Sequence, residues 1–190
     1  MVQKYVLMED IVLNNSANEV KVFLNKNYPQ LKCYEIDVNK IVFEERVKIK
    51  CFQCSKFGVK WTCPPNIPNL NYSKILSEYN MIMLVYGEFK YTDQNYEDVR
   101  TESTNIIHRA LLDLERYMFS RNHSLCTSFI GGSCKLCKSG CGKDKCNNQE
   151  SARIPVEAIG INVVRTMNNV GIKVDFPVNK EIKRIGLLLL

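Results

Sequence analysis

Residues 131–146 read GGSCKLCKSGCGKDKC, and no other stretch of this sequence is so unlike ordinary globular packing. Four cysteines fall within thirteen residues at C-x2-C-x3-C-x4-C spacing: Cys134, Cys137, Cys141 and Cys146. Thiolates bind metals, and two cysteines separated by two residues can place both sulfurs on one ion or on one face of a cluster. The spacing therefore predicts a metal site with four local ligands.

The compactness of this run favours an iron–sulfur cluster, with zinc as the alternative. Paired cysteines of zinc sites usually stand farther apart, with a knuckle or hairpin between them. The run is similar to the ferredoxin pattern C-x2-C-x2-C-x3-C-P, with one more residue in each of the two later gaps. Its glycines permit tight winding and leave backbone N–H groups free to point at sulfur. They are Gly131, Gly132, Gly140 and Gly142.

A second, looser set lies upstream in CFQCSKFGVKWTCPP, residues 51–65, and comprises Cys51, Cys54 and Cys63. Two prolines after Cys63 hold the chain extended beside a ligand. A fourth ligand is missing. Cys33 and Cys126 lie in predicted strands, where a cysteine is commonly a small buried hydrophobe, although either could complete the set. Otherwise one metal position would be open to water, a carboxylate or a substrate, as in catalytic metal sites.

The composition is that of a single domain in a reducing compartment. The chain has 190 residues, of which 45% are hydrophobic and 24% charged. No window approaches eighteen apolar residues, and the N-terminus lacks the order of a secretory signal. We therefore expect a cytoplasmic protein that does not enter a membrane. Disulfides are rare in the cytosol, so the nine cysteines point to metal.

The formal net charge of +6 overstates the positive charge of a metal-loaded protein. Each four-thiolate cluster would contribute about −2, so two clusters would leave about +2. Eight lysines in or beside the cysteine segments are solvated, offset this charge, or receive an acidic redox partner protein. Nucleic acid is not expected, because no predicted helix carries a continuous basic stripe. The lysines are Lys48, Lys50, Lys56, Lys60, Lys135, Lys138, Lys143 and Lys145.

Hydrophobic periodicity predicts alternating strands and helices over residues 1–190. We expect strands at 33–38, 41–49, 81–89, 124–130, 172–178 and 185–190. Residues 5–7 fit a short strand or a helix start, and helices are expected at 16–28, 73–79, 93–122 and 155–171. Ser16 would cap the first helix, while the last would begin at Pro155, carry Glu157 in its first turn and end at Gly171. The prediction is one α/β or α+β domain, with a mixed sheet, packing helices and cysteine-rich loops at strand ends.

The remaining candidate residues have ordinary explanations. His108 lies off the apolar stripe of its helix and is expected to be solvated or lightly packed, not a ligand, and His123 sits at a helix end, where a cation is favourable. Trp61, the only tryptophan, would pack in the core or shield a cluster from water. No serine–histidine–acid set, phosphate loop or metal-binding histidine pair is present, so any chemistry would belong to the metal centre itself.

The combination of motifs resembles the predicted metal-binding proteins called domain of unknown function 2284. The residues that carry the resemblance are Cys51-x2-Cys54, WTCPP at 61–65, GGSCKLC at 131–137, the following Cys141 and Cys146, and ARIPVEAIGINV at 152–163. The chain departs from the family pattern at Asn147-Asn148 and at Ile154. The resemblance implies a metal site, an association with anaerobes and no established reaction.

Three functions are consistent with these patterns. The first is a redox accessory of anaerobic metabolism that holds one or two 4Fe-4S clusters. The second is a small enzyme in which the three-cysteine set offers an open iron to a substrate. The third is a binding module stabilised by zinc. The candidate ligands are the same in all three: Cys51, Cys54, Cys63, Cys134, Cys137, Cys141 and Cys146.

Overall fold

The computed structural model describes residues 2–175 and 177–190. The first half of the chain forms α1 (Val2–Asn27), β1 (Leu31–Glu35), the 3-10 helix η1 (Val38–Lys40), α2 (Glu45–Phe52), α3 (Tyr72–Ser77) and β2 (Ile82–Lys90). The second half forms α4 (Tyr96–Phe119), β3 (Thr127–Ile130), α5 (Val163–Asn169) and β4 (Glu181–Leu189). The expected mixture of helices and strands is confirmed.

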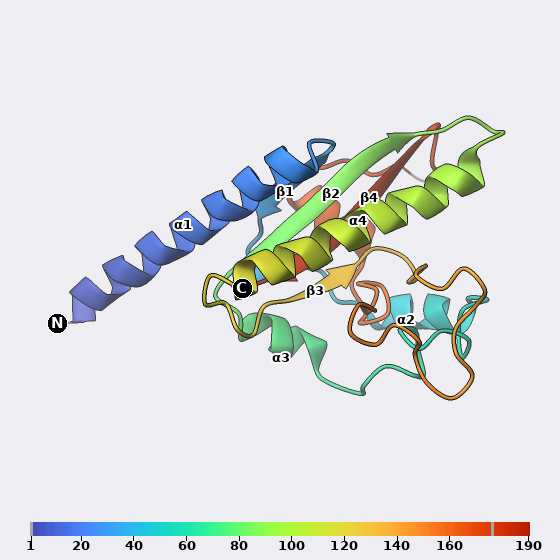
Figure 1. The fold of residues 1–190 in the computed structure, drawn as a ribbon, viewed down its shortest axis with the longest axis horizontal. Helices are drawn as coiled ribbons and strands as arrows, with labels where there is room; N and C mark the ends of the chain where they lie inside the picture. The colour runs from blue at the N-terminus through green and yellow to red at the C-terminus, as the bar shows by residue number, and fades with distance from the viewer. Residues whose placement is uncertain (1, 176) are drawn as a thin grey trace.

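The four described strands form one sheet in the order β1-β2-β4-β3 (Figure 1). Strand β4 lies between β2 and β3, with Leu189 opposite both Ile82 and Thr127. All three strand pairs are antiparallel, so the sheet is not mixed as predicted. The fold is therefore α+β. The segment after α2 and the segment between β3 and α5 hold most of the residues of interest for function.

Both faces of the sheet are buried. On one face, α1 and α4 cover Met83, Val85 and Leu188 (Figure 1). On the other face, alternate strand residues such as Leu84 and Leu187 pack against α3, α5 and the turns between β3 and α5. The continuous apolar run of β2 is thus a strand covered on both sides, as expected from its sequence.

The close approach of α4 to the sheet depends on a glycine. A Cβ added at Gly186 of β4 would lie 2.4 Å from Leu111 Cδ1 and 2.9 Å from Phe129 O. Leu111 belongs to α4 and Phe129 to β3. The absence of a side chain at position 186 therefore lets the helix settle directly on β4 where β4 pairs with β3.

The strand predicted at 41–49 is wrong, because most of that stretch belongs to helix α2. Val47 and Ile49 alternate with lysines as in a strand, but α2 has no buried residue and Ile49 is 60% exposed. A helix suits the charges, since Glu45 lies in the first turn and pairs with Lys48 one turn later. Phe43 alone makes a bridge, antiparallel to Ile161.

The predicted helix 155–171 is also wrong over its first half. Residues 155–161 form turns, and Gly160 adopts a φ of +93°, which interrupts a helix. Asn162 then caps the short helix α5 by accepting a hydrogen bond from Arg165 N. Gly171 follows α5 with a φ of +78°, as expected for a helix stop.

Two further boundaries differ from expectation. Helix α1 begins at Val2, so residues 5–7 are helical and Ser16 lies within the helix instead of capping it. The strand predicted at 172–178 is absent among residues 172–175, 177 and 178.

Candidate metal centre

Two loops carry the predicted ligands and lie against each other. One loop follows α2 and contains Cys54 and Cys63, and the other follows β3 and contains Cys134 to Cys146; Figure 1 shows both at one end of the molecule, below α4. Lys60 Nζ donates a hydrogen bond to Cys134 O at 2.5 Å. Trp61 Nε1 donates to Gly142 O at 2.8 Å. Two side chains of the first loop therefore hold the backbone of the second.

The four cysteines of the second loop line one small hollow of about 10 Å³, the four-cysteine hollow. Its wall also includes three consecutive residues of the first loop and one asparagine. The lining comprises Lys60, Trp61, Thr62, Cys134, Leu136, Cys137, Cys141, Cys146 and Asn148. Sequence spacing and tertiary structure thus bring the same four residues together.

Polar groups in this hollow point toward sulfur. Asn148 Nδ2 donates to Cys137 Sγ at 3.0 Å. Thr62 Oγ1 is buried and makes no hydrogen bond to an oxygen or nitrogen among the described residues, although it lies near enough to the Cys63 thiol to lower its pKa. Burial raises the pKa of the Cys134 thiol, although the Leu136 N–H and the nearby Lys60 ammonium oppose this shift. Donors and a cation directed at sulfur stabilise thiolates.

The winding of the second loop depends on glycine at two positions. Gly140 has a φ of +95°, a conformation that costs an L-residue energy. A Cβ at Gly142 would lie 2.3 Å from Lys145 O. Glycine is thus required where the loop turns between Cys137 and Cys146, as the sequence predicted.

The other three cysteines line a larger cavity of about 580 Å³, the three-cysteine pocket. Cys51 comes from α2, and Cys54 and Cys63 from the loop that follows it. Burial, with Cys51 and Cys54 nearby, raises the pKa of the Cys63 thiol to about 11. The lining comprises Val47, Lys50, Cys51, Cys54, Ser55, Lys56, Phe57, Cys63, Pro64, Glu97, Arg100, Gly132, Ser133, Lys135, Pro155, Glu157, Ala158 and Arg184.

Glu157 stands beside the three cysteines, in the turns where a helix was expected. Both of its carboxylate oxygens accept the Gly132 N–H, at 3.2 and 3.1 Å, and its backbone oxygen accepts the Cys51 Sγ–H at 3.7 Å. Burial raises the pKa of the Glu157 carboxyl. Burial also raises the pKa of Cys51, and the neighbouring Glu157 and Cys54 add to this shift. No local sequence pattern predicted that Glu157 belongs to this site.

The opposite wall of the three-cysteine pocket is basic. Arg184 of β4 donates from Nε to Ser103 Oγ at 3.2 Å and from Nη2 to Arg100 O at 3.4 Å, which fixes its guanidinium beside the start of α4. Burial lowers the pKa of Lys135, and the cations of Arg100, Lys60 and Arg184 lower it further. Arg100 and Arg184 do not stand at any recognisable sequence spacing from the cysteines, so tertiary structure alone brings them to the pocket.

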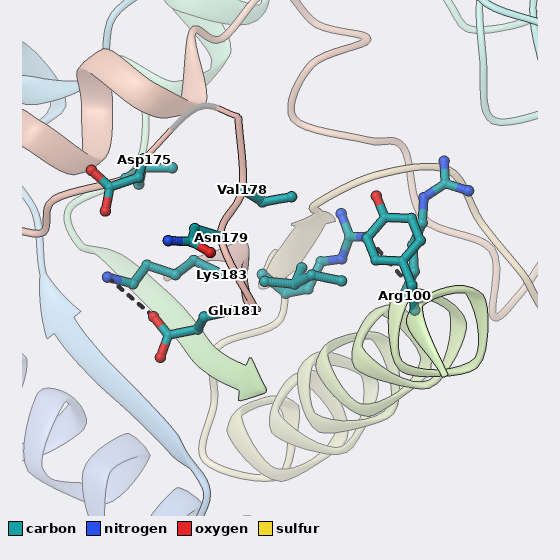
Figure 2. A pocket seen from close by; sticks show the side chains of 10 residues that line it. Arg100, Asp175, Val178, Asn179, Glu181 and Lys183 are labelled. Atoms are coloured by element: carbon teal, nitrogen blue, oxygen red, sulfur yellow. Dashed lines mark hydrogen bonds and ion pairs between the residues drawn. The ribbon is translucent and has the colours of Figure 1, made fainter. Parts of the chain in front are cut away.

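A smaller hollow of about 220 Å³ shares Arg100 and Arg184 with the three-cysteine pocket. Figure 2 shows Arg100, on α4, at one side of it, with Asp175, Glu181 and Lys183 at the other. Lys183 pairs with Glu181 at 3.6 Å, so charges on that side are mutually satisfied. The smaller hollow contains no cysteine.

The two cysteine sites share walls. Thr62 lines the four-cysteine hollow, whereas the next residue, Cys63, lines the three-cysteine pocket. On the other loop, Ser133 lines the three-cysteine pocket and the next residue, Cys134, lines the hollow. Because consecutive Cα atoms are about 3.8 Å apart, the two sites are immediate neighbours.

Cys33 and Cys126 line neither cysteine site. Both pack against the hydrophobic cluster between the sheet and α4. Burial raises the pKa of Cys33 to about 11 and that of Cys126 to about 12. Cys126 Sγ donates to Glu115 O at 3.6 Å. Their surroundings are those of small buried hydrophobes.

The histidines take no part in either cysteine site. His108 is fully buried, contrary to the prediction of a solvated or lightly packed side chain, and its Nε2 lies 2.8 Å from Ser151 O. His123 Nε2 lies 3.0 Å from Ser16 Oγ. Trp61, as described above, lies at the join between the two loops instead of in the main core.

Within the described residues, no group of three or more His, Cys, Asp and Glu side chains has an arrangement suited to one metal ion. The seven cysteines therefore line two cavities, but their sulfur atoms are not arranged as the ligands of one metal ion. Metal sites commonly form together with metal binding, which deprotonates the thiols and fixes their positions.

Comparison with known proteins gives a family and no closer relative. No helix in the described parts of the chain is both long and apolar enough to cross a membrane. Neither the curated proteins nor the solved structures include a significant match. The model of one family, described as "Predicted metal-binding protein (DUF2284)", matches residues 34–190, which include both cysteine loops and the whole sheet apart from the first residues of β1. The chain therefore belongs to this family of predicted metal-binding proteins.

Proposed function

We propose that this protein holds two neighbouring iron–sulfur clusters and serves as a redox accessory of anaerobic metabolism. Cys134, Cys137, Cys141 and Cys146 would hold one 4Fe-4S cluster, and Cys51, Cys54 and Cys63 the other. The observation that carries the proposal is the wall shared by the two cavities, in which Thr62 and Cys63 face different sites. Bound clusters would supply one-electron chemistry, and this adjacency suits electron transfer between them.

The donor set of the four-cysteine hollow suits a cluster, although the hollow, at about 10 Å³, would have to widen to admit a cubane. Four thiols surround the hollow, Asn148 already donates to one sulfur, and the Thr62 hydroxyl makes no hydrogen bond to an oxygen or nitrogen in the described residues. Hydrogen bonds to sulfur and exclusion of water both tune cluster potentials. Trp61 lies on the same wall and would keep water from the centre.

A second candidate function is favoured by the three-cysteine pocket. A site with three cysteines would leave one metal position unfilled by thiolate, and neither Cys33 nor Cys126 lines this pocket. The pocket measures about 580 Å³, within the range of small-molecule sites. In this role the protein is an enzyme that presents an open iron to a small substrate, while the neighbouring cluster supplies electrons.

The test is anaerobic purification of the full chain, with iron, zinc and acid-labile sulfide counted per chain. About eight irons with matching sulfide indicate two cubanes, and about four indicate one. Reversible bleaching of the visible bands by dithionite should accompany them. A colourless protein that contains zinc and no sulfide would instead establish the zinc-stabilised binding module and overturn both iron–sulfur functions.

Two variants assign the clusters to their sites. Cys137→Ala should remove the cluster of the four-cysteine hollow, and Cys54→Ala that of the three-cysteine pocket. Cys33→Ala is the matched control and should retain both clusters. A loss of iron in the control as large as in Cys54→Ala would show that Cys33 closes the second site.

A further inference from the structure

The wall of the three-cysteine pocket carries more cations than its own acids can neutralise. Its positively charged residues are Lys50, Lys56, Arg100, Lys135 and Arg184, and its carboxylates are Glu97 and Glu157. Five cations less two carboxylates leave a formal excess of +3. The four-cysteine hollow, by contrast, has Lys60 as the one cation in its lining.

Three of these cations, Arg184, Lys135 and Lys56, have no ion pair with a carboxylate among the described residues. The Arg184 guanidinium is fixed by a hydroxyl and a carbonyl, those of Ser103 and Arg100, and no carboxylate oxygen in the described residues lies within 4.0 Å of it. The side chains of Lys135 and Lys56 have no hydrogen bond or ion pair with any part of the chain that the structure describes. Arg100 pairs with Glu97 at 3.1 Å, so this pair adds no net charge to the pocket wall.

The position of Arg184 is unusual for a surface cation. Arg184 shares one face of β4 with Gly186 and Leu188, the face that packs against α4. Farther along the strand this face is part of the hydrophobic core. Burial lowers the pKa of Arg184; the Glu157 carboxylate opposes this shift, and the neighbouring Arg100 adds to it. Half-buried cations that repel one another are unfavourable unless an anion joins them. Glu157 is a single carboxylate near Arg184, Arg100 and Lys135, so it leaves an excess of positive charge on this wall.

We infer that the three-cysteine pocket binds a small organic anion, whose carboxylate or phosphate group contacts Arg184 and Lys135 while the rest of the molecule extends toward Cys51, Cys54 and Cys63. An arginine fixed by two hydrogen bonds is suited to grip a planar oxyanion, and a lysine adds a movable charge. The inference deepens the second candidate function and rests on it for the ligand's place beside the metal.

The competing explanation is that these cations serve only to offset the charge of a thiolate cluster. A cluster with three thiolates would carry about −1, which is less than the excess on the pocket wall. The two explanations differ in their consequences. An anion site predicts saturable binding of a free ligand, whereas charge compensation predicts a changed cluster potential and no binding.

The experiment is isothermal titration of the metal-loaded full chain, at constant ionic strength, with inorganic phosphate, succinate and the uncharged succinamide. Succinate or phosphate should bind with one-to-one stoichiometry, and which of them binds more tightly distinguishes a carboxylate from a phosphate ligand. Succinamide should not bind. Arg184→Gln and Lys135→Gln should each weaken anion binding about tenfold to hundredfold, because each removes a charged hydrogen-bond donor.

Arg109→Gln is the matched control. Arg109 is an exposed arginine of α4 that pairs with Glu102 outside the pocket, and its loss should leave anion binding unchanged. Absence of saturable binding for both anions overturns the inference, as does binding that is unaffected in both Arg184→Gln and Lys135→Gln. Metal and sulfide are counted on the same samples. Failure of the iron–sulfur proposal therefore shows as missing iron, separately from failure of anion binding.

Discussion

Trp61 Nε1 donates a hydrogen bond to Gly142 O across 2.8 Å, joining the loop of the three-cysteine set to the loop of the four-cysteine set. The two residues are 81 positions apart in the chain, so the bond is a long-range tie between segments with little regular secondary structure. Lys60 makes a second tie beside it, to Cys134 O. These two hydrogen bonds therefore link the loop of one cysteine site to the loop of the other.

Trp61→Phe is expected to weaken that coupling. The ring remains, but the indole donor is lost, which should reduce the free energy of unfolding by about 1 kcal/mol. Iron content per chain should fall in the same variant, because the four-cysteine hollow loses part of its wall. Chemical denaturation and iron analysis measure the two effects.

A control for this variant is Tyr91→Phe, which removes a hydrogen bond to Val178 O between two residues that line neither cysteine site. It should lose a similar amount of stability and no iron. Equal iron loss in the two variants would mean that Trp61 acts only through global stability.

Cys63→Ala and Cys126→Ala form a second matched pair. Burial raises the pKa of both thiols, but only Cys63 lines a cysteine pocket. Cys63→Ala should lose the metal of the three-cysteine site, and Cys126→Ala should retain it at somewhat reduced stability. Iron counting and the visible spectrum distinguish them. The opposite pattern would make Cys126 a ligand and close the site.

His108 should make stability depend on pH just below neutrality. Burial lowers the pKa of its ring below the ordinary value of 6.5, and Nδ1 has no hydrogen-bond partner in the described residues. The unfolded chain therefore takes up a proton at a higher pH than the folded chain does. The contribution of His108 to the free energy of unfolding is therefore complete above pH 6.5, the pKa of an ordinary histidine, and is lost as the pH falls below that value.

His108→Gln removes this titration. Denaturant midpoints measured between about pH 7.5 and about pH 5.5 should fall for the unmodified protein and change less for the variant. The same pH slope in both proteins would show that other groups control acid stability.

Gly186→Ala should destabilise the fold by about 1–3 kcal/mol. The added methyl would meet Leu111 and the Phe129 carbonyl at distances below 3.0 Å, so α4 or β3 must shift. Gly58→Ala, at a position with no atom within 4 Å of an added Cβ, tests the backbone contribution separately, since Gly58 has a φ of +67°. Thermal unfolding measures both, and an unchanged midpoint for Gly186→Ala would contradict the close packing.

Elements with a strong periodic pattern could be predicted from the sequence. The apolar stripe of α4 and the continuous run of β2 both correspond to buried surfaces, and the prediction of each is confirmed. The strand prediction failed over the part of 41–49 that belongs to α2. Val47 and Ile49 alternate with lysine as in a strand, although their helix lies on the surface. The helix prediction failed at residues 155–161. The apolar residues there are buried, but they lie in turns, because Gly160 interrupts the helix and Asn162 starts a new one.

The candidate site divides in the same way. The cysteines could be found because thiol ligands keep short, recognisable spacings. Glu157, Arg100 and Arg184 could not, because they come from a turn, a helix and a strand that only the folded sheet brings together. Their roles depend on burial and on missing counter-charges, neither of which a local pattern records.

The place of β4 in the sheet also bears on the order of events during synthesis. Strand β4 follows both cysteine loops in the chain, yet it lies between β2 and β3 and is their only link in the described sheet. Until residues 181–189 have left the ribosome, β3 and the loop after it have no sheet to join. Arg184 arrives with the same strand. We therefore expect a nascent chain to carry the four cysteines of the second loop beside an unpaired β3 until β4 has been synthesised, and loading of that site to follow the synthesis of β4.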